Sequence, residues 1–434
     1  MVVFFFSMND FSRTEQWGSR VTRTATGMPR YRALRLLAVA AASAIMLTAC
    51  TAAPVPTATT APENLALSIG SLLPLTGSLA GVGPATTAAA ALAVDDINAA
   101  AAGISITLTP KDAGDASSDT ATASVKDLLA AGVSVVVGPV SNGVSKMVID
   151  PITSAGVVQI SPGNTSPDFT NYADHGLYWR TSPSCVLEGS ALGGFIAKQG
   201  VSSLGIIDQA GYCGAGLGDA VKVAFEASGG TVISSVTLDE SDTNISSKVT
   251  TVVSGKPAAF AVIGSQASSV VPVLTAAGIT GAQLYFAGLS IGDHSADFAA
   301  GSLTGAVASH PGPDLSALTD FTKRLMKANP AITDISYAAE TYDAVVLVAL
   351  AALAARGTSG KQIAGKLQEV SGGSGNGTKT TDFATAATVI RSGGVANYDG
   401  LSGPITFDDS GDPAGATIGF YRFGANNVSS PARL

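Results

Sequence analysis

Short apolar runs of the kind that form buried strands alternate along this chain with longer runs of helical spacing, and this alternation restricts the fold more than any other feature. In residues 84–102, for example, Ala90, Val94 and Ile97 recur at helical spacing. An order of strand, helix, strand and helix predicts a parallel sheet covered by helices. The first strand-like runs are residues 65–75, 104–108, 133–138 and 157–161, and the helical runs between them are 84–102, 117–131 and 142–155.

The same pattern starts again after Thr181. The chain has 434 residues, which is too long for one ordinary core and suits two lobes. We therefore predict an α/β fold of two Rossmann-like lobes with parallel central sheets. Strand-like residues 405–407 and 416–423, joined by a turn-rich segment, predict a closing hairpin. The other helical runs lie near 185–199, 216–228, 244–254, 267–277, 314–328 and 336–356, and the other strand-like runs are 203–208, 231–238, 258–264, 283–288 and 303–309.

Composition excludes several classes of protein. Charged residues make up 13% of the chain, about half the usual ~25%, and hydrophobic residues make up 46%, which argues against a disordered chain. Acidic residues outnumber basic ones by 32 to 24, whereas a nucleic-acid binder needs a basic face. The three histidines and three cysteines form neither an HExxH nor a paired CxxC motif. We expect no metal, no cofactor and no nucleic-acid partner.

Residues 28–49 have the features of a secretory signal peptide. Three arginines between positions 30 and 35 precede an apolar run of 12 residues, 36–47, which is shorter than the ~20 residues that span a bilayer. Residues 1–27 add nothing to such a signal, so Met28 is an alternative start. The signal region as a whole is residues 1–49.

The signal ends in Leu47-Thr48-Ala49-Cys50, which resembles the bacterial lipobox. The resemblance implies cleavage before Cys50 and a lipid on its sulfur; an ordinary signal with a chance cysteine is the alternative. Residues 50–64 would then be the lipidated cysteine and an extended tether, because they are rich in Pro, Ala and Thr. After cleavage before Cys50, residues 50–434 would keep 18 of the 24 basic and 30 of the 32 acidic residues. We expect a lipid-anchored protein on the extracytoplasmic side of the cell membrane, in the periplasm or on the outer face.

A series of loop motifs follows the predicted strands. Their order and spacing resemble the type I periplasmic-binding proteins of the leucine/isoleucine/valine-binding branch, over residues 65–423. The motifs are SLLPLTGSLAGVG at 71–83, AVDDINAA at 93–100, VVVGPVSNGVS at 135–145, ISPGNTSPDFT at 160–170, WRTSPS at 179–184 and YDGLSGPITFDDSGDP at 398–413.

The resemblance implies a protein that captures a small polar organic solute between its lobes and delivers it to an ABC permease. Such a protein is not an enzyme, and we expect a monomer. The family also implies three crossovers, which we place near Thr181, His310 and Pro404. Lobe 1 would then comprise residues 65–180 and 311–403, and lobe 2 residues 182–309 and 405–434.

Four ligand contacts are implied by the resemblance, position by position. Asn142, which follows Ser141 at a predicted helix start, would offer its side chain and backbone N–H groups to a ligand carboxylate, and a helix N-terminus is an anion site. Ser141 would also cap the helix. Gly163 and Thr165 match backbone-carbonyl and hydroxyl contacts. Tyr212 matches an aromatic residue that closes on the ligand from the second lobe.

Three positions depart from the family pattern. Val82 and Gln266 stand where aromatic residues are expected, and Leu289 stands where an acid would pair with the ligand ammonium. Gln266 remains a candidate contact, and Asp293 or Asp208 could supply the missing acid. We therefore predict that leucine, isoleucine and valine are not bound tightly, because an unpaired buried ammonium is costly.

Cys185 and Cys213 remain after Cys50, an even pair in an oxidising compartment. Cys185 begins a predicted helix and Cys213 follows the next strand, so both would lie at the carboxyl edge of the sheet. A disulfide is the leading interpretation, and two free thiols are the alternative.

Two other functions stay open. Residues 288–292, GLSIG, match the nucleophile elbow of secreted α/β-hydrolases around Ser290, with His294 and His310 downstream. No HGGG-type oxyanion loop is present, however, and His294 lies too close to Ser290 in sequence. The second alternative is a ligand-sensing accessory protein, which would use the same cleft as a transport component.

Overall fold

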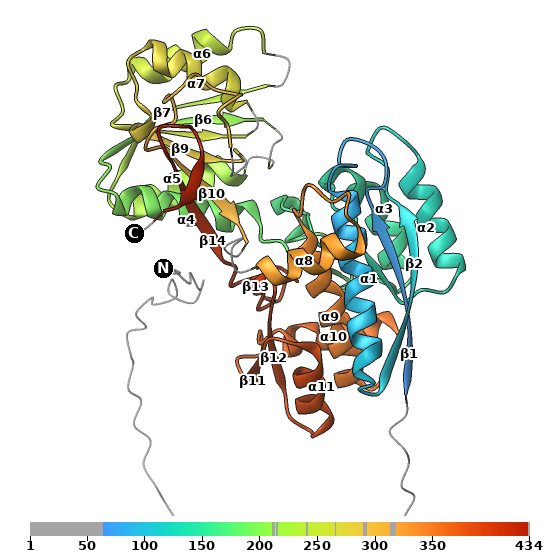
Figure 1. Cartoon of the computed structure of the whole chain (residues 1–434). Helices are drawn as coiled ribbons and strands as arrows, with labels where there is room; N and C mark the ends of the chain where they lie inside the picture. The colour runs from blue at the N-terminus through green and yellow to red at the C-terminus, as the bar shows by residue number, and fades with distance from the viewer. Residues whose placement is uncertain are drawn as a thin grey trace, which may run out of the picture. The chain divides into compact units, whose positions relative to one another are not determined.

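A five-stranded parallel sheet forms the first lobe of the computed structural model, which describes residues 64–210, 213, 216–239, 242–264, 266–289, 293–312 and 318–432. The predicted signal peptide, Cys50 and the tether lie outside the described residues. The sheet order is β2-β1-β3-β4-β5 (Figure 1). Its strands are β1 (Leu65–Leu73), β2 (Ile104–Asp112), β3 (Val135–Val137), β4 (Val158–Ser161) and β5 (Tyr178–Arg180).

Helices cover both faces of this sheet, as the short strand β3 illustrates. Val135 and Val137 point into a core that α9 dominates, whereas Val136 points into a second core with α2 and α3. Figure 1 shows the late helices of the chain beside α1, which is formed near its beginning. The helices are α1 (Gly83–Ala100), α2 (Thr120–Ala130), α3 (Asn142–Ser154), α8 (Thr319–Ala328), α9 (Ala338–Ala355), α10 (Gly360–Val370) and α11 (Phe383–Arg391).

Helix α9 is the central helix of the first lobe. Among the described helices it is the one with the length and apolar character to cross a membrane, yet 78% of its 18-residue window is buried inside the fold. Its residues from Ala344 to Leu353 all belong to the larger core of the lobe. The apolar character of α9 is therefore explained by burial on all sides.

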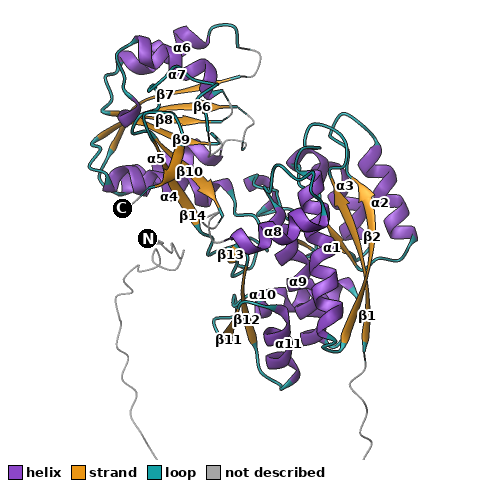
Figure 2. Cartoon of the chain, in the orientation of Figure 1, coloured by secondary structure: helices purple, strands orange, loops and turns teal. Residues whose placement is uncertain are grey.

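The second lobe has a seven-stranded sheet in the order β15-β14-β10-β9-β8-β6-β7, in which β6 to β10 are parallel and β14 and β15 are antiparallel. Figure 2 shows helices on both sides of these strands. The strands are β6 (Ser203–Gln209), β7 (Thr231–Leu238), β8 (Ala259–Ile263), β9 (Leu284–Ala287), β10 (Val307–Pro311), β14 (Ile418–Phe423) and β15 (Ser429–Pro431). The helices are α4 (Cys185–Lys198), α5 (Gly216–Ala227), α6 (Ile245–Ser254) and α7 (Ala267–Ala276).

The C-terminal region differs from the prediction in two respects. The hairpin expected between residues 405–407 and 416–423 forms only in part: Phe407 bridges Pro413 in antiparallel fashion, whereas β14 pairs with β10 and β15. Helices α10 and α11 were also not expected. They pack beside a small sheet of β11 (Thr378–Thr380), β12 (Ala396–Gly400) and β13 (Gly403–Pro404).

Residues 405–412, expected in lobe 2, pack on lobe 1. Ile405 and Phe407 belong to the first core, where the Phe407 ring lies edge-on to Trp179 at 5.1 Å between centroids. Arg180, fully buried, donates from Nε and Nη2 to the Asp412 carboxylate at 2.6 and 2.5 Å. Burial of two apolar side chains and a two-point ion pair explains why this segment stays with the first lobe.

Two glycines set the position of α4 in the second lobe. A Cβ on Gly189 would lie 2.5 Å from the Leu217 carbonyl oxygen, and one on Gly193 would lie 2.4 Å from that of Val221. The absence of side chains lets α4 approach α5 closely. This packing fixes one face of α4 against α5 and fixes the position of the neighbouring residue Glu188.

Candidate ligand-binding site

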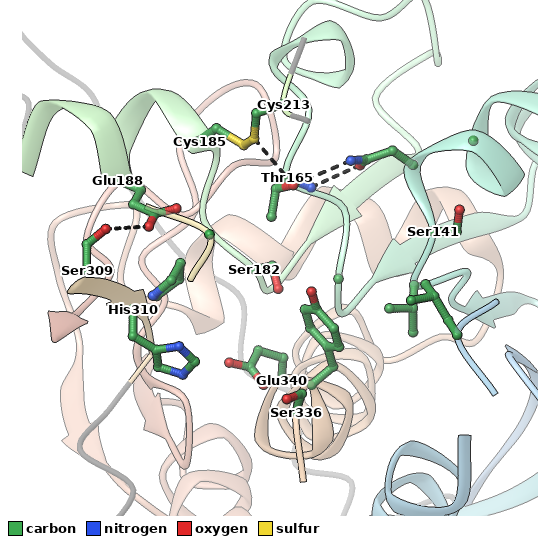
Figure 3. Close-up of a pocket in the computed structure, with 18 of the residues that line it drawn as sticks. Ser141, Thr165, Ser182, Cys185, Glu188, Cys213, Ser309, His310, Ser336 and Glu340 are labelled. Atoms are coloured by element: carbon green, nitrogen blue, oxygen red, sulfur yellow. Dashed lines mark hydrogen bonds between the residues drawn. A yellow bond between two sulfur atoms is a disulfide. The ribbon is translucent and has the colours of Figure 1, made fainter. Parts of the chain in front are cut away.

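A cavity of about 450 Å³ is lined by residues from both lobes (Figure 3). Its walls are formed by loops that follow strands β3, β4 and β9, by the end of β10 and by the first residues of helices α3, α4 and α9. The carboxyl ends of parallel strands are the usual place for ligands in open α/β sheets.

The start of α3 forms one wall. Ser141 caps the helix, because its Oγ accepts a hydrogen bond from the backbone N–H of Val144 at 3.4 Å. Asn142 and Gly143 follow it and line the cavity. Their N–H groups donate no hydrogen bond within the described part of the chain. Two free N–H groups at a helix N-terminus suit a ligand anion.

The Asn142 side chain holds the next loop in place. Its Oδ1 accepts hydrogen bonds from the N–H groups of Thr165 and Ser166 at 3.0 and 3.2 Å, and its Nδ2 lies 3.4 Å from the Thr165 hydroxyl. The carboxamide oxygen is therefore occupied, and the donors that Asn142 retains for a ligand are its backbone N–H and the second hydrogen of Nδ2.

Gly163 and Thr165 both line the cavity. Gly163 permits a close approach of two loops, because a Cβ there would lie 2.5 Å from Cγ1 of Val140. Arg180 supports the same loop from behind by donating from Nη1 to the backbone oxygens of Asn164 and Ser166 at 3.3 and 2.7 Å. The buried ion pair thus fixes the loop that carries Thr165.

Cys185 and Cys213 form a disulfide in the structure, with Cα atoms 6.2 Å apart, and both residues line the cavity. The Thr165 hydroxyl lies 3.7 Å from Sγ of Cys213 (Figure 3), and the Thr165 carbonyl accepts the N–H of Cys185 at 3.0 Å. The disulfide therefore packs directly against a predicted ligand contact.

The opposite wall carries acidic side chains that sequence reasoning missed. Glu188, in the first turn of α4, is 6% exposed and accepts a hydrogen bond from the Ser309 hydroxyl at 2.6 Å. Glu340, in the first turn of α9, also lines the cavity. Figure 3 shows Glu188, Ser309 and His310 on the side of the cavity away from Ser141.

Burial raises the pKa of both carboxyls to about 7, although the Ser309 hydroxyl lowers that of Glu188 in part. Burial also raises the pKa of Tyr337 to about 12, and the nearby charges of Glu340 and Glu188 add to this shift. Burial lowers the pKa of His310, which favours its neutral form. Among the described residues, this wall is therefore polar and has acidic groups but no positive charge.

Tyr337 has an unusual backbone conformation. It precedes α9 with φ of 63°, in the left-handed region that a bulky residue rarely adopts. The tyrosine lines the cavity and is partly buried. Strained residues of this kind are concentrated at ligand sites.

The remaining predicted contacts lie elsewhere. Gln266 precedes α7, where its Nε2 donates to the Asp239 carbonyl at 3.2 Å, and Asp293 is exposed and accepts the N–H of Ser295 at 2.8 Å. Neither is among the described residues that line the cavity, and the same is true of Asp208. Tyr212 lies outside the described residues.

One signal in the sequence could have identified the acidic wall. Glu188 is the only acid in an otherwise apolar helical run, and Glu340 is one of two in the run that becomes α9. Charges at such positions require a structural or functional partner. For Asp343, the second acid of α9, the partner is structural: its carboxylate accepts hydrogen bonds from Tyr398, Leu401 and Ser402.

The hydrolase alternative gains no support from the described histidines. Nδ1 of His294 lies 2.7 Å from Asp297 Oδ2, and its ring packs against Phe298 and Phe423. His294 thus has a structural role beside the apolar core of the second lobe. Ser290 lies outside the described residues.

Two α/β lobes that share a polar cavity define a two-lobed ligand-binding protein. The family model described as "Periplasmic binding protein" matches residues 66–422, and the chain belongs to this family. This agrees with the resemblance of the loop motifs and with the predicted fold class.

Curated relatives match parts of the chain. The chain is 36% identical over 99 residues to the chemotactic signal transduction system substrate-binding protein BasB of Halobacterium salinarum, which covers 23% of this chain and 24% of BasB. It is 29% identical over 194 residues to the Leu/Ile/Val-binding protein BraC3 of Rhizobium johnstonii, which covers 44% of this chain and 52% of BraC3. The matches thus span about a quarter to a half of these relatives.

Solved structures match nearly the whole described region. A branched-chain amino acid ABC transporter ligand-binding protein from Burkholderia xenovorans has a TM-score of 0.66 at 14% identity, covering 85% of this chain and 94% of that one. The binding protein LivJ from Streptococcus pneumoniae, in complex with isoleucine, has a TM-score of 0.59 at 20% identity, covering 85% and 100%. A solute-binding protein from R. palustris, in complex with benzoate, has a TM-score of 0.60 at 19% identity, covering 84% of this chain and 95% of that one. At these identities the similarity establishes the fold.

Proposed function

We propose that this chain is the extracytoplasmic solute-binding component of an ABC importer and that it binds a small carboxylate-bearing solute in the cavity. The observation that carries the proposal is the start of α3, where Asn142 and Gly143 line the cavity and their N–H groups donate no hydrogen bond within the described residues. Family membership supports the solute-binding role. Isoleucine and benzoate, named with two similar structures, both carry a carboxylate.

A thermal-shift screen over amino acids, amides and aromatic acids tests the proposal. A solute at ~1,000 times its Kd stabilises the folded protein by about 4 kcal/mol, which shifts the melting curve clearly. The absence of a shift with every carboxylate in the screen would contradict the proposal.

Gly143→Pro then tests the anion site for any solute found. Proline is tolerated in the first turn of a helix and removes one N–H, and α1 already carries Pro84 in its first turn. Gly143→Ala is the matched control, since it adds a Cβ and keeps the N–H. Loss of one hydrogen bond to a charged group costs about 1.5–3 kcal/mol, so Kd should rise about tenfold to a hundredfold for proline only. Equal affinities of the two variants would place the carboxylate elsewhere.

We also propose that Cys50 carries a lipid that anchors the protein to the membrane. Cys50→Ala should release the protein into the soluble fraction, and mass spectrometry of the mature N-terminus should show a lipidated cysteine. An unmodified residue 50 in the mature protein would refute the anchor without affecting the solute site.

A sensing role is the second candidate, and the match to BasB, named for chemotactic signal transduction, favours it. The two roles predict different phenotypes. Deletion of a transport component abolishes uptake of the labelled solute, whereas deletion of a sensor leaves uptake intact and abolishes the response to the solute.

A further inference from the structure

The disulfide between Cys185 and Cys213 lies in two environments at once. On one side, both residues belong to an apolar core of the second lobe, where they are 2% and 3% exposed. On the other side, both residues line the cavity. Stabilisation of the lobe uses only the first environment, so the place of the bond in the cavity wall is an additional property.

The bond also meets the first lobe, at the loop that carries Thr165. The Thr165 hydroxyl lies 3.7 Å from Sγ of Cys213 (Figure 3), and the Thr165 carbonyl accepts the N–H of Cys185 at 3.0 Å. Two residues further on, Pro167 packs against the start of α5, where a Cβ on Gly216 would lie 2.8 Å from Cγ of Pro167. The second lobe therefore contacts this loop at both half-cystines and at Gly216.

The two half-cystines are held in different ways. Cys185 is the first residue of α4, and the close packing of α4 on α5 at Gly189 and Gly193 fixes this helix. Cys213 lies in the connection between β6 and α5, and the disulfide is its covalent link to α4. When the bond breaks, we therefore expect Cys213 to move and Cys185 to stay.

Reduction forces the two sulfur atoms apart. Bonded sulfurs lie about 2 Å from each other, which is closer than two thiol sulfurs can approach. The Thr165 hydroxyl lies beside Sγ of Cys213, and both residues line the cavity. Asn142 contacts the same hydroxyl from the first lobe, through its Nδ2 at 3.4 Å. Movement of Cys213 therefore disturbs Thr165 and the wall against which a solute would lie.

We propose that this disulfide is a redox-controlled element of the binding site: the oxidised bond holds Cys213 against Thr165, and its reduction by a small dithiol lowers the affinity for the solute. The inference rests on the proposed function and adds a control to the same cavity. One thiolate of the dithiol attacks a sulfur of the bond, and its second thiolate then resolves the mixed disulfide. The products are two cysteine thiols and the oxidised, cyclic dithiol, so two electrons and two protons pass to the protein.

The cavity is the side from which a small dithiol reaches the bond, because the other side is the apolar core. A bound solute should therefore slow reduction. It should also shift the equilibrium, because coupling between two binding or reaction equilibria is reciprocal. If the oxidised protein binds a solute about tenfold more tightly, the solute favours the protein disulfide by the same factor, which corresponds to about 30 mV for a two-electron couple.

The first arm of the test measures affinity by calorimetry. The probe is the carboxylate with the largest thermal shift among the amino acids, amides and aromatic acids screened for the proposed function. Reduction of the mature protein with dithiothreitol, followed by anaerobic removal of the reductant, should raise the Kd of this probe about tenfold, the effect of losing one hydrogen bond to a charged group. Reoxidation should restore the Kd. The double variant Cys185→Ala with Cys213→Ala should bind like the reduced wild type and should not respond to dithiothreitol.

The second arm needs no solute and separates control of the site from loss of stability. Hydrogen exchange of the backbone N–H groups in residues 163–169, which belong to the first lobe, should become about tenfold faster when the disulfide is reduced. Val249→Ala is the control, because Val249 is fully buried on α6 in the second lobe and lies outside the cavity wall. This variant destabilises the second lobe and should change neither the exchange of residues 163–169 nor the affinity.

The inference requires both changes. If reduction leaves either the Kd of the probe or the exchange of residues 163–169 unchanged, the inference is overturned and the proposed function stands. If no carboxylate binds, the proposed function is overturned, and the exchange of residues 163–169 alone decides whether the disulfide controls the loop. Melting of the double variant establishes that it is folded, and if it is not, the reduced wild type serves for both arms.

Discussion

Replacement of Glu188 by glutamine should stabilise the unliganded protein at alkaline pH. The pKa of this carboxyl is raised from 4.5 to about 7 by burial, so the folded state holds its proton more tightly than the unfolded state. The contribution of this carboxyl to stability is therefore greatest below pH 4.5 and is lost as the pH rises through 7. Ionisation of Glu188 costs the folded state about 3 kcal/mol, because each tenfold change in proton affinity corresponds to about 1.4 kcal/mol.

Two features of the structure refine this magnitude. Glu188 lies in the first turn of α4, where the helix dipole stabilises a negative charge by about 0.3–1 kcal/mol, and glutamine loses this benefit. Glutamine keeps the shape of the side chain and a partner for the Ser309 hydroxyl. The net gain should be about 2–3 kcal/mol at pH 8 and about 1 kcal/mol or less at pH 5.

The measurement is urea denaturation of unliganded wild type and Glu188→Gln at both pH values, followed by circular dichroism. Glu226→Gln provides the control for loss of one negative charge from the protein as a whole. If Glu188→Gln destabilises the protein equally at pH 5 and pH 8, the wild-type carboxylate is ionised at no cost, and the reasoning from burial fails.

Three further changes test other parts of the structure. Asp412→Ala should lower the free energy of unfolding in urea by about 3–5 kcal/mol, because it leaves the charge of Arg180 buried without a partner. The double variant Arg180→Met with Asp412→Leu should recover much of this loss. An equal loss in both variants would argue against the ion pair as the cause. Reduction of the disulfide between Cys185 and Cys213 should lower the free energy of unfolding by about 2–4 kcal/mol. If a thiol reagent labels both cysteines in the native oxidised protein, the disulfide is not present. Asn142→Ala should weaken carboxylate binding about tenfold, because it releases the backbone N–H groups of Thr165 and Ser166. If calorimetry shows unchanged affinity, Asn142 does not contribute to the binding site.

The repeated strand and helix pattern was sufficient to predict both lobes, because period-2 and period-3.6 spacing are local properties. Residues such as Val135 and Val137 on β3 identify a buried strand without reference to any partner. The cap at Ser141 could be predicted for the same reason, since it depends on adjacent residues. The Ser359–Gln362 capping box before Ile363 is an equally local signal, and it predicts the start of α10.

The parts that could not be predicted depend on contacts between distant residues. Nothing near residues 405–412 indicates that Phe407 meets Trp179 or that Asp412 meets Arg180. Glu188 and Glu340 are 152 positions apart in sequence, and only the assembled lobes bring them to one cavity. The amide of Asn142 likewise acquires its role from Thr165, a residue on another loop.

The central position of α9 has a consequence for how this protein is made. The first lobe begins at β1 near the start of the chain, but its core is completed by residues 338–355 and its buried arginine is neutralised only by Asp412. During synthesis, the first sheet must therefore remain unfinished, with its apolar face exposed, until the last part of the chain has left the ribosome. For the extracytoplasmic protein proposed above, this late closure favours export, because a translocation channel accepts only an unfolded chain. Truncation before residue 412 should accordingly yield a protein that is degraded, although all five strands of its first sheet are present.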